Sequence, residues 1–199
     1  MKVRRIATQF GYSMVGVLAL ACSFASPALA QDDHSHMIAA DHRDPSPEQR
    51  RQQSALVEEV RRITKNFQNA PPDGFQLVFG CVSGGDFGAM GMHFLTGANL
   101  DSEIYVDKPE ILLYEPLPNG RIRLTGVDYL VDKKAWESNP AHVGPPQLFG
   151  QLFHLFDSPN RFGLDPFYTL HVWAWKDNPN GTFTNWNPNV SCDAFAGEK

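Results

Sequence analysis

The chain has 199 residues, of which 17 are Lys or Arg and 22 are Asp or Glu, and its formal net charge is −5. No basic run follows Lys65, which argues against binding to nucleic acid or to an anionic membrane surface. The chain is rich in aromatic residues for a core, and its 16 Gly and 15 Pro predict short elements and many loops.

Residues 1–30 have the pattern of a secretory signal peptide. A positive start at Lys2, Arg4 and Arg5 precedes an apolar run, and Ala28-Leu29-Ala30 matches a cleavage site. The apolar run is too short for a permanent membrane helix, which needs about 20 apolar residues. We therefore predict a bacterial periplasmic or secreted protein that has no transmembrane segment after cleavage. Cleavage would change the formal net charge from −5 to −8 by removing those three basic residues.

Cleavage would also leave two of the three cysteines. An oxidising compartment and an even count predict a disulfide between Cys81 and Cys192. A loop of about 110 residues closed in this way is stabilised by about 4–5 kcal/mol in the chain-entropy estimate. The third cysteine, Cys22, follows a segment that resembles a lipoprotein box. Leu20 stands where that box needs a small residue, so we expect no lipid anchor at Cys22.

Residues 31–45 are polar and predict a disordered lead. Its three histidines, His34, His36 and His42, lie among aspartates and could hold a divalent metal weakly, but we interpret the segment as a solvated linker. We expect residues 46–199 to form a single globular domain.

An amphipathic helix is predicted over residues 46–69. Ser46 is a suitable N-cap, Pro47 fits the first helical position, and Gln49 completes a capping box. An apolar stripe repeats at helical spacing: Leu56, Val57, Val60, Ile63 and Phe67. The stripe must pack on another element, most simply on a sheet.

The rest of the chain has the pattern of strands, predicted at residues 75–82, 89–96, 110–115, 121–131 and 167–176. Asn119-Gly120 favours a hairpin between two of them, and the last strand is apolar on both faces. A short helical turn is expected at residues 134–137, and residues 148–156 fit either a helix or a strand. The pattern predicts an α+β fold in which the helix packs on a mainly antiparallel sheet, which could curl into a half-barrel.

Strict alternation in residues 121–131 would place Asp128 on one face with Ile122, Leu124 and Leu130. Asp128 is then either a residue at the rim of the sheet or a buried acid. We interpret it as a rim residue.

Three histidines, His93, His154 and His171, lie inside apolar segments, where each ring nitrogen needs a partner. One hypothesis is a metal site of His93 and His171, with an oxygen from Glu110 or Glu115. A second is acid–base chemistry of a histidine beside a carboxylate. The third is a set of core histidines without a functional role. The sequence has no HExxH or CxxC motif to decide among them, and whether His154 joins a site stays open.

Aromatic side chains gather near the end of the sequence and could line an apolar ligand pocket. The candidates are Tyr168, Trp173 and Trp175, with Phe183 and Trp186. Aromatic residues on strands more often pack a core.

Four segments of the predicted domain have distinctive sequences: GAMGMHFL (88–95), PEILLYEP (109–116), PPQLFGQLFHLF (145–156) and FYTLHVWAWKDNPNGTFTNWNPNVSC (167–192). Together they resemble a group of exported bacterial proteins that has no assigned function, over roughly residues 75–192. The resemblance implies an exported single domain and implies no catalytic or ligand residues.

Three functions remain open at this stage. The first is an envelope protein that binds a metal or a small apolar ligand through His93, His171 and nearby aromatic residues. The second is an enzyme that uses the same histidines with Glu110 or Glu115, with or without a metal. The third is a structural or partner-binding envelope protein, which would expose an apolar patch of several hundred Å².

Overall fold

The structure is a computed structural model that describes residues 44–197. The predictions for residues 1–43, among them the signal peptide, most of the lead and its three histidines, lie outside the described residues. Within residues 44–197, no helix combines the length and the apolar character needed to cross a membrane.

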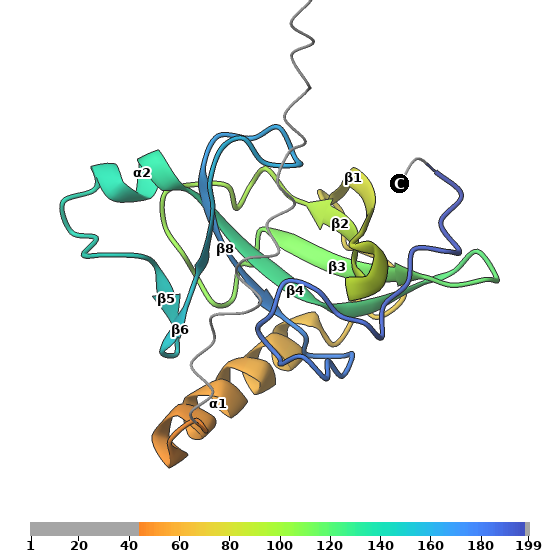
Figure 1. The fold of residues 1–199 in the computed structure, drawn as a ribbon, viewed down its shortest axis with the longest axis horizontal. Helices are drawn as coiled ribbons and strands as arrows, with labels where there is room; N and C mark the ends of the chain where they lie inside the picture. Colours follow the sequence, from red (N-terminus) through yellow and green to blue (C-terminus); the bar gives the residue numbers. More distant parts are fainter. Residues whose placement is uncertain (1–43, 198–199) are drawn as a thin grey trace, which may run out of the picture.

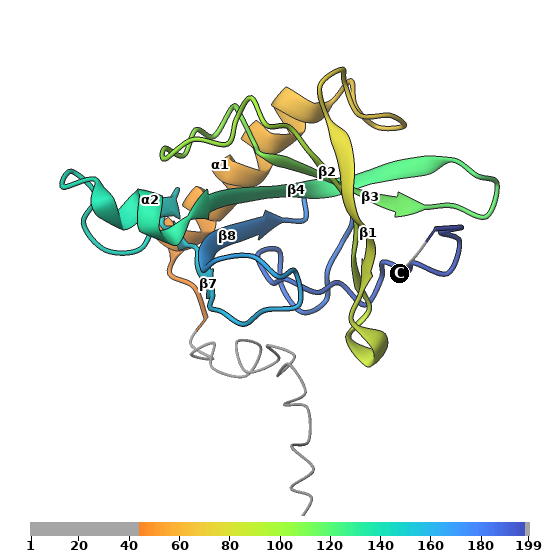
Figure 2. The ribbon, with the colours of Figure 1, turned by 90° about the horizontal axis from the view of Figure 1, so that it is seen from above.

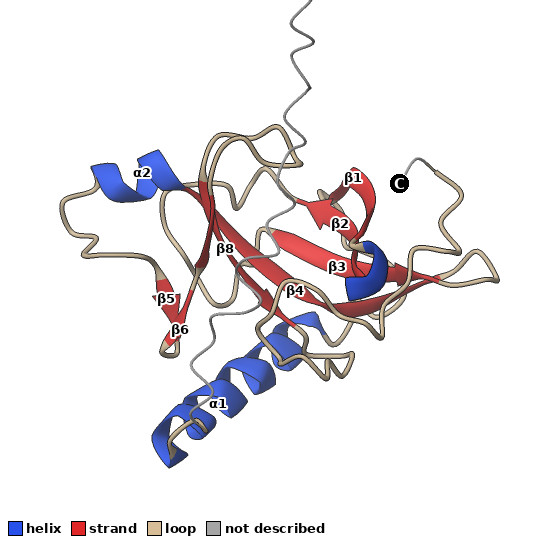
Figure 3. Ribbon diagram, viewed as in Figure 1, coloured by secondary structure: helices blue, strands red, loops and turns tan. Residues whose placement is uncertain are grey.

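The core of the fold is a six-stranded antiparallel sheet in the order β1-β2-β3-β4-β8-β7 (Figure 1). Its strands are β1 (Gln76–Ser83), β2 (Ala89–Leu95), β3 (Ile111–Pro116), β4 (Ile122–Asp132), β7 (His154–Phe156) and β8 (Phe167–Val172). A two-stranded hairpin, β5 (Gln147–Leu148) and β6 (Gln151–Leu152), stands beside the sheet. The helices are α1 (Pro47–Thr64) and α2 (Lys133–Ser138), and a short 3-10 turn, Gly85–Phe87, joins β1 to β2 (Figure 3). The sheet curls into a half-barrel, so the predicted α+β fold is confirmed.

Helix α1 begins as the sequence predicts. The Ser46 hydroxyl accepts a hydrogen bond from the Gln49 amide at 3.2 Å, and the Gln49 side chain accepts one from the Ser46 amide at 2.7 Å. Leu56 and Val60 are fully buried. The helix ends at Thr64, five residues before the predicted end, and the Thr64 hydroxyl accepts a hydrogen bond from the Trp175 indole. Helix α1 thus covers one face of the sheet, and the β7–β8 connection lies on the other side (Figure 2).

Residues 148–156, which fit either a helix or a strand in sequence, take the strand alternative in β5, β6 and β7. One strand prediction needs correction. Strand β8 ends at Val172 rather than at residue 176. After Val172 the chain turns out of the ladder, because the Trp173 amide donates to Thr182 and the Trp175 amide donates to Thr125.

The alternation predicted for β4 is also wrong, because the strand contains a β-bulge. Leu113 of β3 pairs with Gly126, but the next residue, Tyr114, pairs with Leu124, so Thr125 is an extra residue. An extra residue reverses the faces on which later side chains lie. Leu124 therefore shares the large core cluster with Tyr129, while Asp128 and Leu130 lie on the opposite face.

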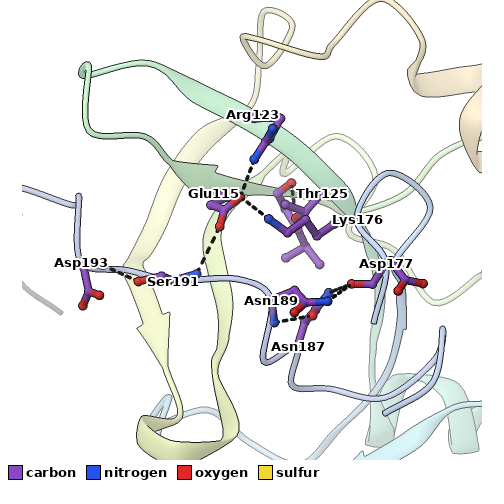
Figure 4. Close-up of polar contacts among 10 residues, drawn as sticks. Glu115, Arg123, Thr125, Lys176, Asp177, Asn187, Asn189, Ser191 and Asp193 are labelled. Atoms are coloured by element: carbon purple, nitrogen blue, oxygen red, sulfur yellow. Dashed lines mark hydrogen bonds and ion pairs between the residues drawn. The ribbon is translucent and has the colours of Figure 1, made fainter. Parts of the chain in front are cut away.

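The C-terminal segment is fixed to the sheet by polar contacts and by a disulfide. The Glu115 carboxylate accepts hydrogen bonds from Arg123, Lys176 and the Ser191 amide, at 3.1, 3.0 and 3.4 Å (Figure 4). The predicted disulfide is present and joins Cys81 of β1 to Cys192. Such a bond is compatible with an extracytoplasmic location.

Candidate metal site

Three titratable side chains meet on the face of the sheet opposite α1: His93 of β2, Asp128 of β4 and His171 of β8. Asp128 and His171 are direct partners in the β4–β8 register. His93 comes from two strands away, since β3 separates β2 from β4. Strands separated in this way lie about 9–10 Å apart. Each of the three residues nevertheless offers one ligand atom within 4.8 Å of the others, so their side chains converge on one point.

All three side chains are almost completely buried, with exposed fractions of 2–3%. The His93 Nδ1 lies 3.0 Å from the Gly91 carbonyl oxygen. A carbonyl can only accept, so Nδ1 carries the proton and Nε2 keeps its lone pair. Asp128 accepts a hydrogen bond from the Thr169 hydroxyl. Support of a histidine and a carboxylate by outer groups of this kind is typical of metal ligands.

His171 lacks the partners that a buried imidazole requires. Neither of its ring nitrogens has a hydrogen-bond partner among the residues that the structure describes. Its Nδ1 lies 3.5 Å from the Asp128 carboxylate, beyond a good hydrogen bond. A buried polar group without a partner costs about 1–3 kcal/mol. A purely structural histidine would not normally be left in this state.

The environment sets the charge of each group at neutral pH. Burial, followed by the effect of the nearby His171, lowers the pKa of His93 to about 4. Burial, followed by the charge of His154, lowers the pKa of His171 to about 3. Burial raises the pKa of Asp128 to about 6, against the opposing effect of its hydrogen bond from Thr169. At pH 7 the site therefore contains two neutral imidazoles and one carboxylate, which are the forms that bind metal ions.

The three side chains line a small, mainly apolar cavity. Its other walls are Phe79, Met90, Ile111, Leu130, Phe156, Phe162, Leu164, Phe167 and Thr169. Phe162 comes from the β7–β8 connection and packs against Phe79 of β1, with ring centroids 5.1 Å apart. Its ring centroid lies 6.5 Å from that of His93. The aromatic side chains thus close the cavity over the polar group.

Phe79 reaches the cavity through a second irregularity of the sheet. Val78 pairs with His93, but the next paired residue of β1 is Cys81, opposite Met92. The two extra residues, Phe79 and Gly80, have φ angles of +59° and +63°. A positive φ is unusual for Phe, and strained residues of this kind cluster at functional sites. Bulges are likewise common beside such sites.

Asp128 is the residue that the sequence prediction placed wrongly. It is 3% exposed and belongs to the cavity wall rather than to the rim. The physical reason is the bulge at Thr125, which moves Asp128 away from the face of Leu124. Its partner Thr169 gives no separate signal in the sequence.

The predicted oxygen ligands lie elsewhere. Glu110 is buried, and its carboxylate accepts a hydrogen bond from the Leu130 amide at 2.9 Å. Glu115 holds the C-terminal segment, as described above. Neither belongs to the group of ligand atoms that the structure brings together around His93 and His171.

The aromatic candidates also lie outside the cavity wall. Trp175 packs at α1, and the Tyr168 hydroxyl donates to Glu137. The Trp173 ring is 5.9 Å from the His171 ring, and its indole donates to the Thr184 carbonyl. Phenylalanines line the cavity instead, and the sequence pattern gives no signal that distinguishes these from the other phenylalanines of the chain.

His154 lies on β7 opposite Thr169, and its Nδ1 is 2.9 Å from the Asn185 side-chain oxygen. It is not one of the three converging residues, although its charge lowers the pKa of His171.

Comparisons with known proteins give no relative from which to transfer a function: no family model, no curated protein and no solved structure matches the chain at a significant level.

Proposed function

We propose that this protein is an exported bacterial protein that binds one divalent transition-metal ion through His93, Asp128 and His171. The observation that carries the proposal is the buried imidazole of His171, whose two nitrogens have no hydrogen-bond partner within residues 44–197. A metal ion would satisfy one of them, and the neighbouring imidazole and carboxylate would complete the coordination. The Cys81–Cys192 disulfide supports export.

The donor set favours zinc or a similar ion. Two imidazole nitrogens and one carboxylate oxygen suit zinc, iron, cobalt or nickel better than calcium or magnesium, which prefer oxygen. Tetrahedral ligands at 2.0–2.1 Å from zinc lie about 3.3 Å apart. Ligand atoms within 4.8 Å of one another therefore need only a modest inward movement.

Three protein ligands also leave one coordination position open. Structural zinc sites normally use four protein ligands, whereas sites that bind or activate a further molecule use three. We therefore place this centre in the class that takes an additional ligand from solution.

The proposal is tested by metal titration of the purified protein after chelation. We expect one equivalent of Zn²⁺ to bind, as measured by calorimetry and elemental analysis. Asp128→Asn keeps the shape of the side chain but loses its charge. It should weaken binding by at least about 100-fold, because loss of an outer partner alone costs 10–100-fold. Asp73→Asn, at an exposed position away from the cavity, is the matched control. Equal affinities of the wild-type protein and Asp128→Asn would refute the centre.

A second candidate is metal-free acid–base catalysis by His171 and Asp128, which are direct partners in the β4–β8 register and line the same cavity. Their 3.5 Å separation would have to shorten for proton transfer. Such a dyad needs one imidazole, whereas the metal centre needs two. His93→Gln therefore separates the two functions. It should abolish one-equivalent metal binding, and it would leave a His171–Asp128 dyad in place.

A further inference from the structure

The cavity beside the three proposed ligands, His93, Asp128 and His171, has mainly apolar walls. Eight of its twelve lining residues are apolar, and Asp128 is the only one of the twelve with a carboxylate. The remaining polar members are His93, His171 and Thr169. A molecule at the open coordination position would thus contact the metal on one side and apolar walls on the others.

The charge of the centre restricts what that molecule can be. A divalent ion with one carboxylate and two neutral imidazoles carries a net charge of +1. An uncompensated charge in apolar surroundings is costly. Among the described residues, no second carboxylate lines the cavity to compensate that charge.

The size of that molecule is restricted by Phe162. This side chain contacts aromatic rings on three sides, with centroids 5.1 Å from Phe79, 6.0 Å from Phe156 and 6.1 Å from Phe167. Phe162 belongs to the connection between β7 and β8, not to a strand. Of the twelve wall residues, Phe162 and Leu164 are the two that lie outside the strands, and Phe162 is the larger, so its truncation would enlarge the cavity with little disturbance of the sheet.

We propose that the open position of the His93–Asp128–His171 centre takes a small monoanion, such as a short carboxylate, and that Phe162 limits its size. A monoanion makes the centre neutral, and a dianion or a neutral molecule does not. This inference rests on the proposed metal site. Phe162 is a specificity-determining residue in it and has no part in holding the metal.

The test uses the Co²⁺-substituted protein, whose visible spectrum reports ligands on the metal. Formate and formamide have nearly the same size but differ in charge, and benzoate shares the carboxylate of formate but is larger. We expect formate to change the spectrum with an affinity at least 10-fold higher than those of formamide and benzoate. Phe162→Ala should reduce the preference for formate over benzoate by at least 10-fold. Phe149→Ala, a truncation in the β5–β6 hairpin away from the cavity, should leave it unchanged.

The possible failures can be told apart. Absence of stoichiometric Co²⁺ by elemental analysis would refute the metal site itself. Bound Co²⁺ with equal affinities for formate and formamide would refute the preference for an anion and leave the metal site intact. Equal binding of formate and benzoate by the wild-type protein would refute the size limit, and this comparison does not depend on the folding of a variant.

Discussion

At the scale of single residues, His171 gives a direct test of whether its ring is held for a ligand. Both ring nitrogens are buried, and no residue in the described part of the chain forms a hydrogen bond with either of them. His171→Leu should then raise the free energy of unfolding of the metal-free protein by about 1–3 kcal/mol, because it removes that penalty. Urea denaturation in the presence of a chelator measures the change.

The control for this prediction is His142→Leu. The His142 Nδ1 lies 2.9 Å from the Trp136 carbonyl oxygen, its Nε2 lies 3.2 Å from Glu103, and its ring stacks on the Trp136 indole. This substitution should destabilise the protein. If His171→Leu also destabilises it, His171 has a structural role that the unpaired nitrogens do not reveal.

Glu110 gives a second prediction at this scale, concerning pH. Burial raises the pKa of Glu110 from 4.5 to about 8. The folded state then binds the Glu110 proton more tightly than the unfolded state does. The stabilisation that protonated Glu110 gives to the folded state is therefore lost as pH rises from about 4.5 to about 8. The titration of one proton changes the free energy of unfolding by at most about 1.4 kcal/mol per pH unit.

Glu110→Gln should flatten this decline, since glutamine does not titrate and its side-chain oxygen can still accept from Leu130. Unfolding free energies measured across that pH range for both proteins give the comparison. Glu58→Gln, at an exposed position of α1, serves as the control. Parallel pH profiles for the wild-type protein and Glu110→Gln would contradict the raised pKa.

At the scale of elements, Gly126 allows β4 and β8 to lie close at the site. A Cβ at this position would lie 2.2 Å from the Val172 carbonyl oxygen. Gly126→Ala should therefore destabilise the protein by about 1–3 kcal/mol, the usual cost of overpacking. Gly97→Ala, where an added Cβ meets nothing within 4 Å, should have a much smaller effect. Thermal unfolding of the two variants tests the difference, and equal losses would argue against close packing at Gly126.

The elements also explain which part of the site could be predicted from sequence. His93 and His171 stand out because imidazoles are unusual inside apolar strands. Asp128 was misplaced because a strict period of two cannot show where a bulge adds a residue. The bulge at Thr125 depends on pairing with β3 and on the approach of β8, which are not local properties of the chain. Phe79 and Phe162 were missed for a similar reason, since one lies at a bulge and the other in a connection.

At the scale of the whole molecule, the helix, most strands, the hairpin turn and the disulfide could be predicted. Each has a local or compositional signal: the capping box at Ser46, the turn at Asn119-Gly120, and the even number of cysteines that the predicted cleavage would leave. The early end of β8 could not be predicted, because the residues after Val172 are as apolar as those before it. The strand ends because the Trp173 amide donates to the Thr182 carbonyl and the Trp175 amide donates to the carbonyl of Thr125, which is distant in sequence.

The disulfide between Cys81 and Cys192 should keep the protein in one piece after limited proteolysis. The segment between α2 and β5 is largely exposed, and Val143 there is 94% exposed. A single cut beside Val143 would separate β1–β4 from β7 and β8. The two pieces would stay covalently joined and paired along β4 and β8. Electrophoresis should then show one band without reductant and two bands with it, and two bands without reductant would contradict the linkage. A protein that can be nicked without falling apart is suited to a compartment rich in endopeptidases.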